Sequence, residues 1–238
     1  MRKRILVVGA AALAMVAVAG GAAYLYYFSG LRTAPAQLGL SATPAATGTP
    51  ATTASLSGTW TVAAGSVAGY RVQELFVGQA AKHSAVARTS TVSGGLTVSG
   101  DSSGYEVSAL TITAGLADLH SVDSVLGRDV TQRDGVVRNQ LDVQQFPTAT
   151  FTVASATVPG GFTTQQVDVT ATAKLTIHGV TKDVTVKGKA QLVGDKAEIA
   201  GTTSINMADY GVSPPQVPFV TVDSAVVIEF DIFLTKSS

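Results

Sequence analysis

Cysteine is absent from the 238-residue sequence, and charged residues make up only 13% of it. Without cysteine the chain can form no disulfide bond, thiolate metal site or cysteine nucleophile. Lysine plus arginine and aspartate plus glutamate both number 16, so the formal net charge is zero. Nucleic-acid binding requires a basic face that neutralises phosphates, so we expect no nucleic-acid partner.

Motifs of catalysis are also missing. The sequence contains neither a Gly-x-Ser-x-Gly nucleophile turn nor a glycine-rich phosphate loop. Three histidines, His83, His120 and His178, lie far apart and lack the spacing of a metal-ligand pair. The sequence therefore predicts no catalytic residue, no metal site and no cofactor, and we do not expect an enzyme.

The N-terminus combines basic residues at 2–4 with an uncharged run over 5–30. Such a run is longer than the ~7–15 apolar residues of a signal-peptide core and matches the ~20 of a membrane helix. It ends in aromatic residues of the kind found at membrane interfaces: Tyr24, Tyr26, Tyr27 and Phe28. Residues 1–31 are thus predicted to be a single-pass anchor in the cell membrane, spanning it with 5–28. The basic side stays cytoplasmic, which places the remaining chain in the extracytoplasmic cell envelope. A cleaved signal peptide is the alternative, because Ala17-Val18-Ala19 resembles a cleavage site.

A linker is predicted for residues 32–57. This segment consists mainly of Ala, Thr, Ser, Gly and Pro, with prolines at 35, 44 and 50 and no charge after Arg32. It lacks the apolar surface needed to offset the entropy lost on ordering. We therefore expect a disordered tether.

Residues 58–238 form the folded domain, and their pattern has a period of two. Apolar side chains occupy every second position from Val167 to Ile177, and the pattern resumes after a turn at Gly179. Long strands with one polar face are typical of antiparallel sheets, and closure into a barrel removes their edges. The prediction is an all-β fold, an antiparallel barrel of about eight strands. Tyr105 and Val107 lie out of phase with Leu110, which indicates a β-bulge near Ala109.

Residues 118–145 interrupt the strands with apolar side chains at roughly helical spacing. Gly127 and Gly135 weaken this helical pattern, which favours one or two short helices packed on one end of the barrel.

The inward faces of the predicted strands carry many small residues. They are Gly94, Ala114, Ala149, Ala171, Ala173, Gly188 and Ala190. A barrel of about eight strands is wide enough for side chains to fill or for one small ligand. Small inward residues favour an elongated apolar cavity, although a β-sandwich filled by large residues of the opposite sheet fits the same pattern.

Two stretches resemble the signatures of a known family. They are Gln145-Phe146-Pro147-Thr148-Ala149-Thr150-Phe151 and Lys174-Leu175-Thr176-Ile177-His178-Gly179-Val180-Thr181-Lys182-Asp183-Val184. Their order and spacing are similar to those of the YceI-like, polyisoprenoid-binding barrel proteins, here in a membrane-tethered version. The resemblance implies a lipocalin-like barrel around a long apolar tunnel that holds an isoprenoid chain, such as a quinone or polyprenyl lipid. Lys174 and Met207 depart from the family pattern, and these departures bear on head-group recognition.

The resemblance and the strand phase together predict a lipid-binding tunnel. The predicted lining residues are Ala149, Phe151, Val153, Val169, Ala171, Ala173, Leu175, Ile177, Val186, Ile228 and Phe230. Arg88, Arg133 and Arg138 are candidate head-group contacts, with an exposed ion pair on a helix as the alternative interpretation. The expected partner is an isoprenoid or other long-chain lipid, and the domain is compatible with a monomer or a homodimer. A filled structural or adhesion barrel of the cell envelope is the alternative function.

Overall fold

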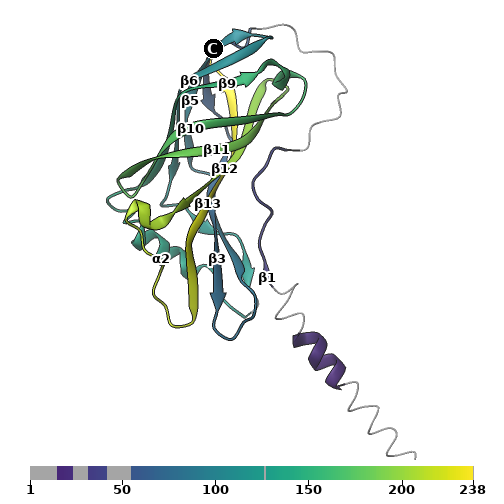
Figure 1. Ribbon diagram of the computed structural model, residues 1–238, viewed down its shortest axis with the longest axis vertical. Helices are drawn as coiled ribbons and strands as arrows, with labels where there is room; N and C mark the ends of the chain where they lie inside the picture. The colour runs from purple at the N-terminus through teal and green to yellow at the C-terminus, as the bar shows by residue number, and fades with distance from the viewer. Residues whose placement is uncertain (1–14, 24–31, 42–54, 126, 238) are drawn as a thin grey trace, which may run out of the picture.

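The computed structural model describes residues 15–23, 32–41, 55–125 and 127–237. Its main body is a twisted antiparallel sheet (Figure 1). The strands are β2 (Gly58–Val62), β3 (Val67–Phe76), β4 (His83–Thr89), β5 (Val92–Asp101), β6 (Gly104–Gly115), β9 (Thr148–Pro159), β10 (Val167–Ile177), β11 (Val180–Val193), β12 (Lys196–Asn206) and β13 (Val220–Lys236).

The sheet closes into a ring of eight strands. β2 and β3 act as one bent strand, because both pair with the same edge of β13, and β4 and β5 continue each other in the same way. The ring then runs β2/β3, β4/β5, β6, β9, β10, β11, β12 and β13, and β13 pairs with both β12 and β2/β3. The predicted barrel is confirmed, and the sandwich alternative is wrong.

Side-chain alternation sets the register, because a slip of one residue would turn every inward side chain outward. In β10, Ala173, Leu175 and Ile177 are buried, whereas Thr170 and Thr172 are exposed. The bulge predicted in β6 is also present. Ala109 adopts a positive φ of 51°, and β6 has one extra residue opposite β5 at this point.

The segment between β6 and β9 covers one end of the barrel. It contains β7 (His120–Ser121), β8 (Ser124–Val125) and one α-helix, α2 (Gln132–Gln140). Leu119, Val137 and Leu141 pack with barrel residues, as the helical pattern predicted. Only one α-helix forms here, because the first half of the segment pairs instead with β4, through β7, and with β1 (Arg32–Thr33), through β8.

The two ends of the barrel differ. The lower end in Figure 1 carries α2, the β3–β4 hairpin and the connection from β12 to β13, which starts with the 3-10 helix η2 (Met207–Tyr210). The upper end carries the C-terminus and the 3-10 helix η1 (Gly160–Thr163). A packed core that includes Trp60 lies at this end. Within it the Tyr105 and Phe162 rings pack edge to face, with their centroids 5.2 Å apart.

Residues 32–41 lie along the outer wall of the barrel, contrary to the prediction that all of 32–57 is disordered. β1 pairs with β8, and Arg71 and Arg88 donate hydrogen bonds to the carbonyl oxygens of Pro35 and Ala36 at 2.8 and 2.6 Å. The backbone N–H of Ser41 donates to the Glu198 carboxylate at 2.6 Å. We call residues 32–41 the strap. Barrel side chains supply the partners of its backbone, which composition alone could not show. Residues 42–54 lie outside the described residues.

Residues 15–23 are helical. Among the residues that the structure describes, no helix is both long and apolar enough to cross a membrane. The rest of the predicted span, residues 5–14 and 24–28, lies outside the described residues, so the anchor stays a prediction.

Candidate functional site

The barrel encloses two adjoining chambers. The lower chamber has a volume of about 570 Å³ and the upper chamber about 150 Å³. They meet at a ring of residues that line both: Ala68, Ala114, Ala149, Leu175 and Ile228. Three of these five are alanines, so the junction between the chambers is bordered mainly by small side chains.

Most of the predicted tunnel residues border these chambers. Ala149, Leu175, Ile177 and Ile228 line the lower one. The residues that line the upper one are Ala149, Phe151, Val153, Val169, Ala171, Leu175, Val186, Ile228 and Phe230. Whether these residues contact a lipid stays a prediction.

Ala173 is the exception among the predicted tunnel residues. It borders neither chamber and is 3% exposed, packed with Val153 and Val186. The strand phase placed it correctly on the inward face, but inward residues can be covered by their neighbours on adjacent strands. Its assignment to the tunnel lining is therefore corrected.

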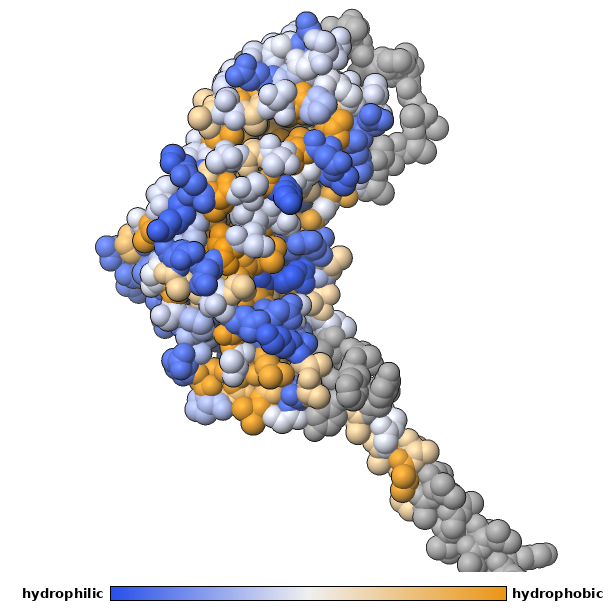
Figure 2. Space-filling view, in the orientation of Figure 1, coloured by the Kyte–Doolittle hydropathy of each residue, from blue (hydrophilic) through white to orange (hydrophobic). Residues whose placement is uncertain are grey.

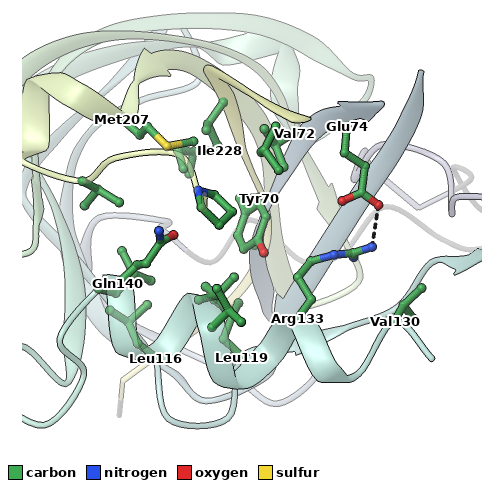
Figure 3. Close-up of a pocket in the computed structure, with 18 of the residues that line it drawn as sticks. Tyr70, Val72, Glu74, Leu116, Leu119, Val130, Arg133, Gln140, Met207 and Ile228 are labelled. Atoms are coloured by element: carbon green, nitrogen blue, oxygen red, sulfur yellow. Dashed lines mark hydrogen bonds and ion pairs between the residues drawn. The ribbon is translucent and has the colours of Figure 1, made fainter. Parts of the chain in front are cut away.

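The lower chamber has an apolar wall and a polar end. Val72, Met207 and Ile228 lie on one side, with Leu116 and Leu119 opposite (Figure 3). Tyr70, Glu74 and Arg133 form the polar end, and Gln140 of α2 also borders the chamber. An amphipathic ligand therefore meets both kinds of surface in this chamber.

Arg133 is held in a buried ion-pair network. Its guanidinium donates to Glu74 Oε1 at 2.8 Å, and to Asp123 Oδ1 at 2.8 Å and Oδ2 at 3.2 Å. Asp123 also accepts from the backbone N–H of Val86 at 2.9 Å and lies 2.6 Å from His83 Nε2. Arg133 contacts the chamber, as predicted for a head-group residue, but two carboxylates already engage it.

The ionisation of this network follows from its burial and hydrogen bonds. Burial alone would raise the pKa of Asp123, but the hydrogen bonds from His83, Arg133 and Val86 outweigh it and lower the pKa to about 2. Burial raises the pKa of Glu74, and the nearby Arg133 counteracts it only in part.

Tyr70 brings a neutral hydroxyl to the polar end. Burial raises the pKa of Tyr70 far above its ordinary value, with Arg133 opposing this shift. The hydroxyl points into the space between α2 and β3 (Figure 3). Tyr70 can donate a hydrogen bond to a polar group of a bound molecule without ionising.

The polar end also brings three potential metal ligands together. Glu74, His83 and Asp123 each offer a ligand atom, and these atoms lie within 4.8 Å of one another. Arg133 already places its positive charge between the two carboxylates. The geometry is therefore that of a satisfied ion-pair network.

The other two predicted head-group arginines lie elsewhere. Arg88 is on the outer wall, where it pairs with the buried Glu229 carboxylate at 2.9 Å, and Arg138 reaches the carbonyl oxygen of Leu119 at 3.4 Å. Neither borders a chamber, so both assignments are corrected. Alternate side chains of β4 face inward. Ala87 is one of them, so the next residue, Arg88, faces outward.

Sequence reasoning missed several residues of the lower chamber. Tyr70 and Glu74 share the inward phase of β3, a signal that a closer reading of residues 67–76 could have used. Met207, Tyr210 and Phe219 also line the chamber. The sequence indicated this segment only in a general way, through the unusual length of the β12–β13 connection. The Tyr210 hydroxyl is buried and has no hydrogen-bond partner among the described residues.

Comparison with known proteins identifies the family. The model of the YceI-like domain matches residues 60–234, nearly the whole barrel. The chain belongs to the YceI-like family. A UPF0312 protein of Pseudomonas putida F1 is 31% identical over 135 residues, which cover 54% of this chain and 65% of that protein. One from Pseudomonas fluorescens SBW25 is 32% identical over 139 residues, covering 56% and 67%. The chain thus spans slightly less than two thirds of the P. putida relative.

A solved structure shares the fold of this YceI-like domain. It is a polyisoprenoid binding domain from Saccharophagus degradans implicated in plant cell wall breakdown. The TM-score is 0.51 at 16% sequence identity, covering 76% of this chain and 99% of that chain. At this identity the likeness concerns the fold alone.

Proposed function

We propose that this YceI-like protein is a non-catalytic lipid-binding protein that holds one isoprenoid chain, of a quinone or polyprenyl lipid, inside the barrel. The observation that carries the proposal is the lower chamber, about 570 Å³ in volume and walled mainly by apolar side chains. This volume falls within the ~300–1,000 Å³ of pockets that bury most of a ligand's surface. The match to the YceI-like domain and the polyisoprenoid-binding domain of the same fold support the choice of ligand.

The driving force is the burial of apolar surface. Each Å² of prenyl chain that leaves water contributes about 25 cal/mol. The bound prenyl chain would begin in the lower chamber and continue past Ala149 into the upper chamber, where Phe151 and Phe230 lie. The head group would remain at the polar end, within reach of Tyr70 and Arg133.

The proposed location is the extracytoplasmic face of the cell membrane, with residues 5–28 as the anchor. This rests on the basic N-terminus and the long uncharged run of the sequence. The alternative, a filled structural or adhesion barrel, requires a packed interior throughout. Two chambers in the described barrel count against it.

Organic extraction tests the proposal directly. The full chain, purified from its native envelope in mild detergent, should release a prenyl lipid that mass spectrometry detects in about equimolar amount. A variant narrowed at the junction, Ala149→Leu, should carry less of it. A wild-type protein that yields no lipid and binds no added polyprenol would contradict the proposed function.

A further inference from the structure

The lower end of the barrel exposes large apolar side chains to solvent. Among the described residues outside 15–23, the large apolar side chains that are exposed are Val77, Val122, Val136 and Phe219. Val77, at the tip of the β3–β4 hairpin, is 70% exposed, and Phe219, in the connection to β13, is 52% exposed. The N–H of Val77 donates to the carbonyl oxygen of Phe219 at 3.0 Å, so the two tips lie side by side. Figure 2 shows hydrophobic residues gathered at this end.

Arg128 joins these two tips. Its guanidinium carbon lies 4.3 Å from the centre of the Phe76 ring and 5.6 Å from that of Phe219. Apolar and aromatic side chains beside an arginine suit a membrane interface, where the charge stays at head-group level. The other charges nearby balance: Lys82 pairs with Asp223 at 2.6 Å, and Asp129 follows Arg128. We define the rim as Val77, Arg128 and Phe219.

The rim borders the mouth of the lower chamber. Phe76, Arg128 and Phe219 line that chamber, and the last two are also exposed on the molecular surface. Whatever surface covers the rim therefore also faces the chamber.

The strap brings the N-terminal chain to this same end. β1 pairs with β8, and the N–H of Arg128 donates to the carbonyl oxygen of Val125, the last residue of β8, at 3.1 Å. The barrel's own first strand begins at the opposite end, since β2 pairs with the last residues of β13. A tether leaving directly from β2 would start at the upper end. With the strap in place, the tether instead leaves the barrel beside the rim. Only residues 24–31 separate β1 from the helical residues 15–23.

We propose that the rim docks on the surface of the lipid bilayer, with the strap holding the mouth of the lower chamber toward the membrane. This inference rests on the proposed lipid-binding function and on the proposed anchor. It adds the face of the barrel that meets the bilayer, and hence a route by which a prenyl chain passes between bilayer and chamber without crossing water.

Fluorescence quenching in vesicles tests the docking. Because the chain has no cysteine, single cysteines can be introduced in the full chain for an environment-sensitive label. Ala80→Cys places the label in the β3–β4 hairpin, and Ser102→Cys places a matched label in the β5–β6 turn at the upper end. In phosphatidylcholine vesicles containing nitroxide-labelled lipid, the label at 80 should be quenched and the label at 102 should not.

Further variants assign the quenching to the rim and the strap. In the Ala80→Cys background, Val77→Ser with Phe219→Ser should abolish quenching, whereas Val122→Ser, away from the hairpin tips, should preserve it. Deletion of residues 33–41 should also abolish it by returning the tether to the upper end. Melting curves of each variant check that the barrel is folded.

The outcomes separate docking from lipid carriage. Equal quenching at both labels, quenching only at 102, or no quenching at either would overturn the docking, even if extraction finds a bound prenyl lipid. Failure of the full chain to float with the vesicles would overturn it as well, together with the anchor. Quenching confined to 80 would support docking, even if the protein yields no lipid and binds no added polyprenol, the result that overturns the proposed function.

Discussion

The two chambers of the barrel share most of their strands but are surrounded differently. The upper chamber is small, about 150 Å³, and lies beside the packed core around Trp60. The lower chamber is nearly four times larger, about 570 Å³, and is partly walled by α2 and the β12–β13 connection. It also contains the buried ion-pair network of Arg133. Regular strand alternation can fill a barrel with side chains, whereas irregular segments across one end leave space and bring polar groups into it.

Removing the Arg133 guanidinium from the lower chamber should have the largest effect on stability. Arg133→Ala leaves the Glu74 and Asp123 carboxylates buried without their guanidinium, and breaking a buried ion pair in this way costs about 3–5 kcal/mol. Denaturant unfolding monitored by circular dichroism measures the change. Arg138→Ala is the control, because this second arginine of α2 pairs with no carboxylate in the described structure. Similar losses for both variants would contradict the difference assigned to the network.

Two alanines of β10 test whether the upper chamber is open. Ala171 borders the chamber, whereas Ala173, two residues on, is packed with Val153 and Val186. Ala173→Leu should overpack the core and lower the free energy of unfolding by about 1–3 kcal/mol. Ala171→Leu should be tolerated, because its added carbons enter empty space. Equal destabilisation in denaturant unfolding would show that the upper chamber is closed in solution.

Narrowing the junction should separate short ligands from long ones. Ala149→Leu adds bulk where the two chambers meet. A short prenyl alcohol such as farnesol should still bind in the lower chamber, while a long polyprenol should lose the affinity contributed by the upper one. Competition against a fluorescent lipid measures both affinities. Ala171→Leu, which reduces the upper chamber without narrowing the junction, is the comparison variant. Unchanged binding of the long polyprenol to Ala149→Leu would place its whole chain in the lower chamber.

The two ends should respond to pH in opposite directions. The lowered pKa of Asp123, about 2, contributes stability above its ordinary pKa of 3.8, and this is lost as the pH falls through 2. On the outer wall beside the upper chamber, burial and the neighbouring Glu198 raise the pKa of Asp231 to about 7. The raised pKa of Asp231 contributes stability that is fully present below pH 3.8 and is lost as the pH rises through 7. Melting temperatures across this range should therefore fall with pH less steeply in Asp231→Asn. An identical slope in the wild type and Asp231→Asn would contradict the raised pKa.

The alternation of side chains predicted much of the upper half of the site. Ala171, Leu175 and Phe230 alternate with polar residues along their strands, and a strand has only two faces, so their inward position follows from the sequence. The lower half could not be predicted in this way. Arg133 lies on a helix and Phe219 in an irregular connection, and neither segment has a two-sided pattern that points to the barrel interior.

Binary patterning by itself determined that this chain forms long antiparallel β-strands with a bulge near Ala109 and with helical structure between residues 118 and 145. These features depend on contacts between neighbours along a strand or across one turn, which the order of residues specifies directly. Only the tertiary structure decided that Ala173 is covered while Ala171 borders a chamber, that Arg88 faces outward, and that residues 32–41 lie against the wall. Each of these depends on side chains that are distant in sequence, as when Arg71 and Arg88 donate to the strap backbone. A segment with few apolar side chains can be ordered where folded neighbours satisfy the hydrogen bonds of its backbone. For the strap, those neighbours come together only once the barrel has closed.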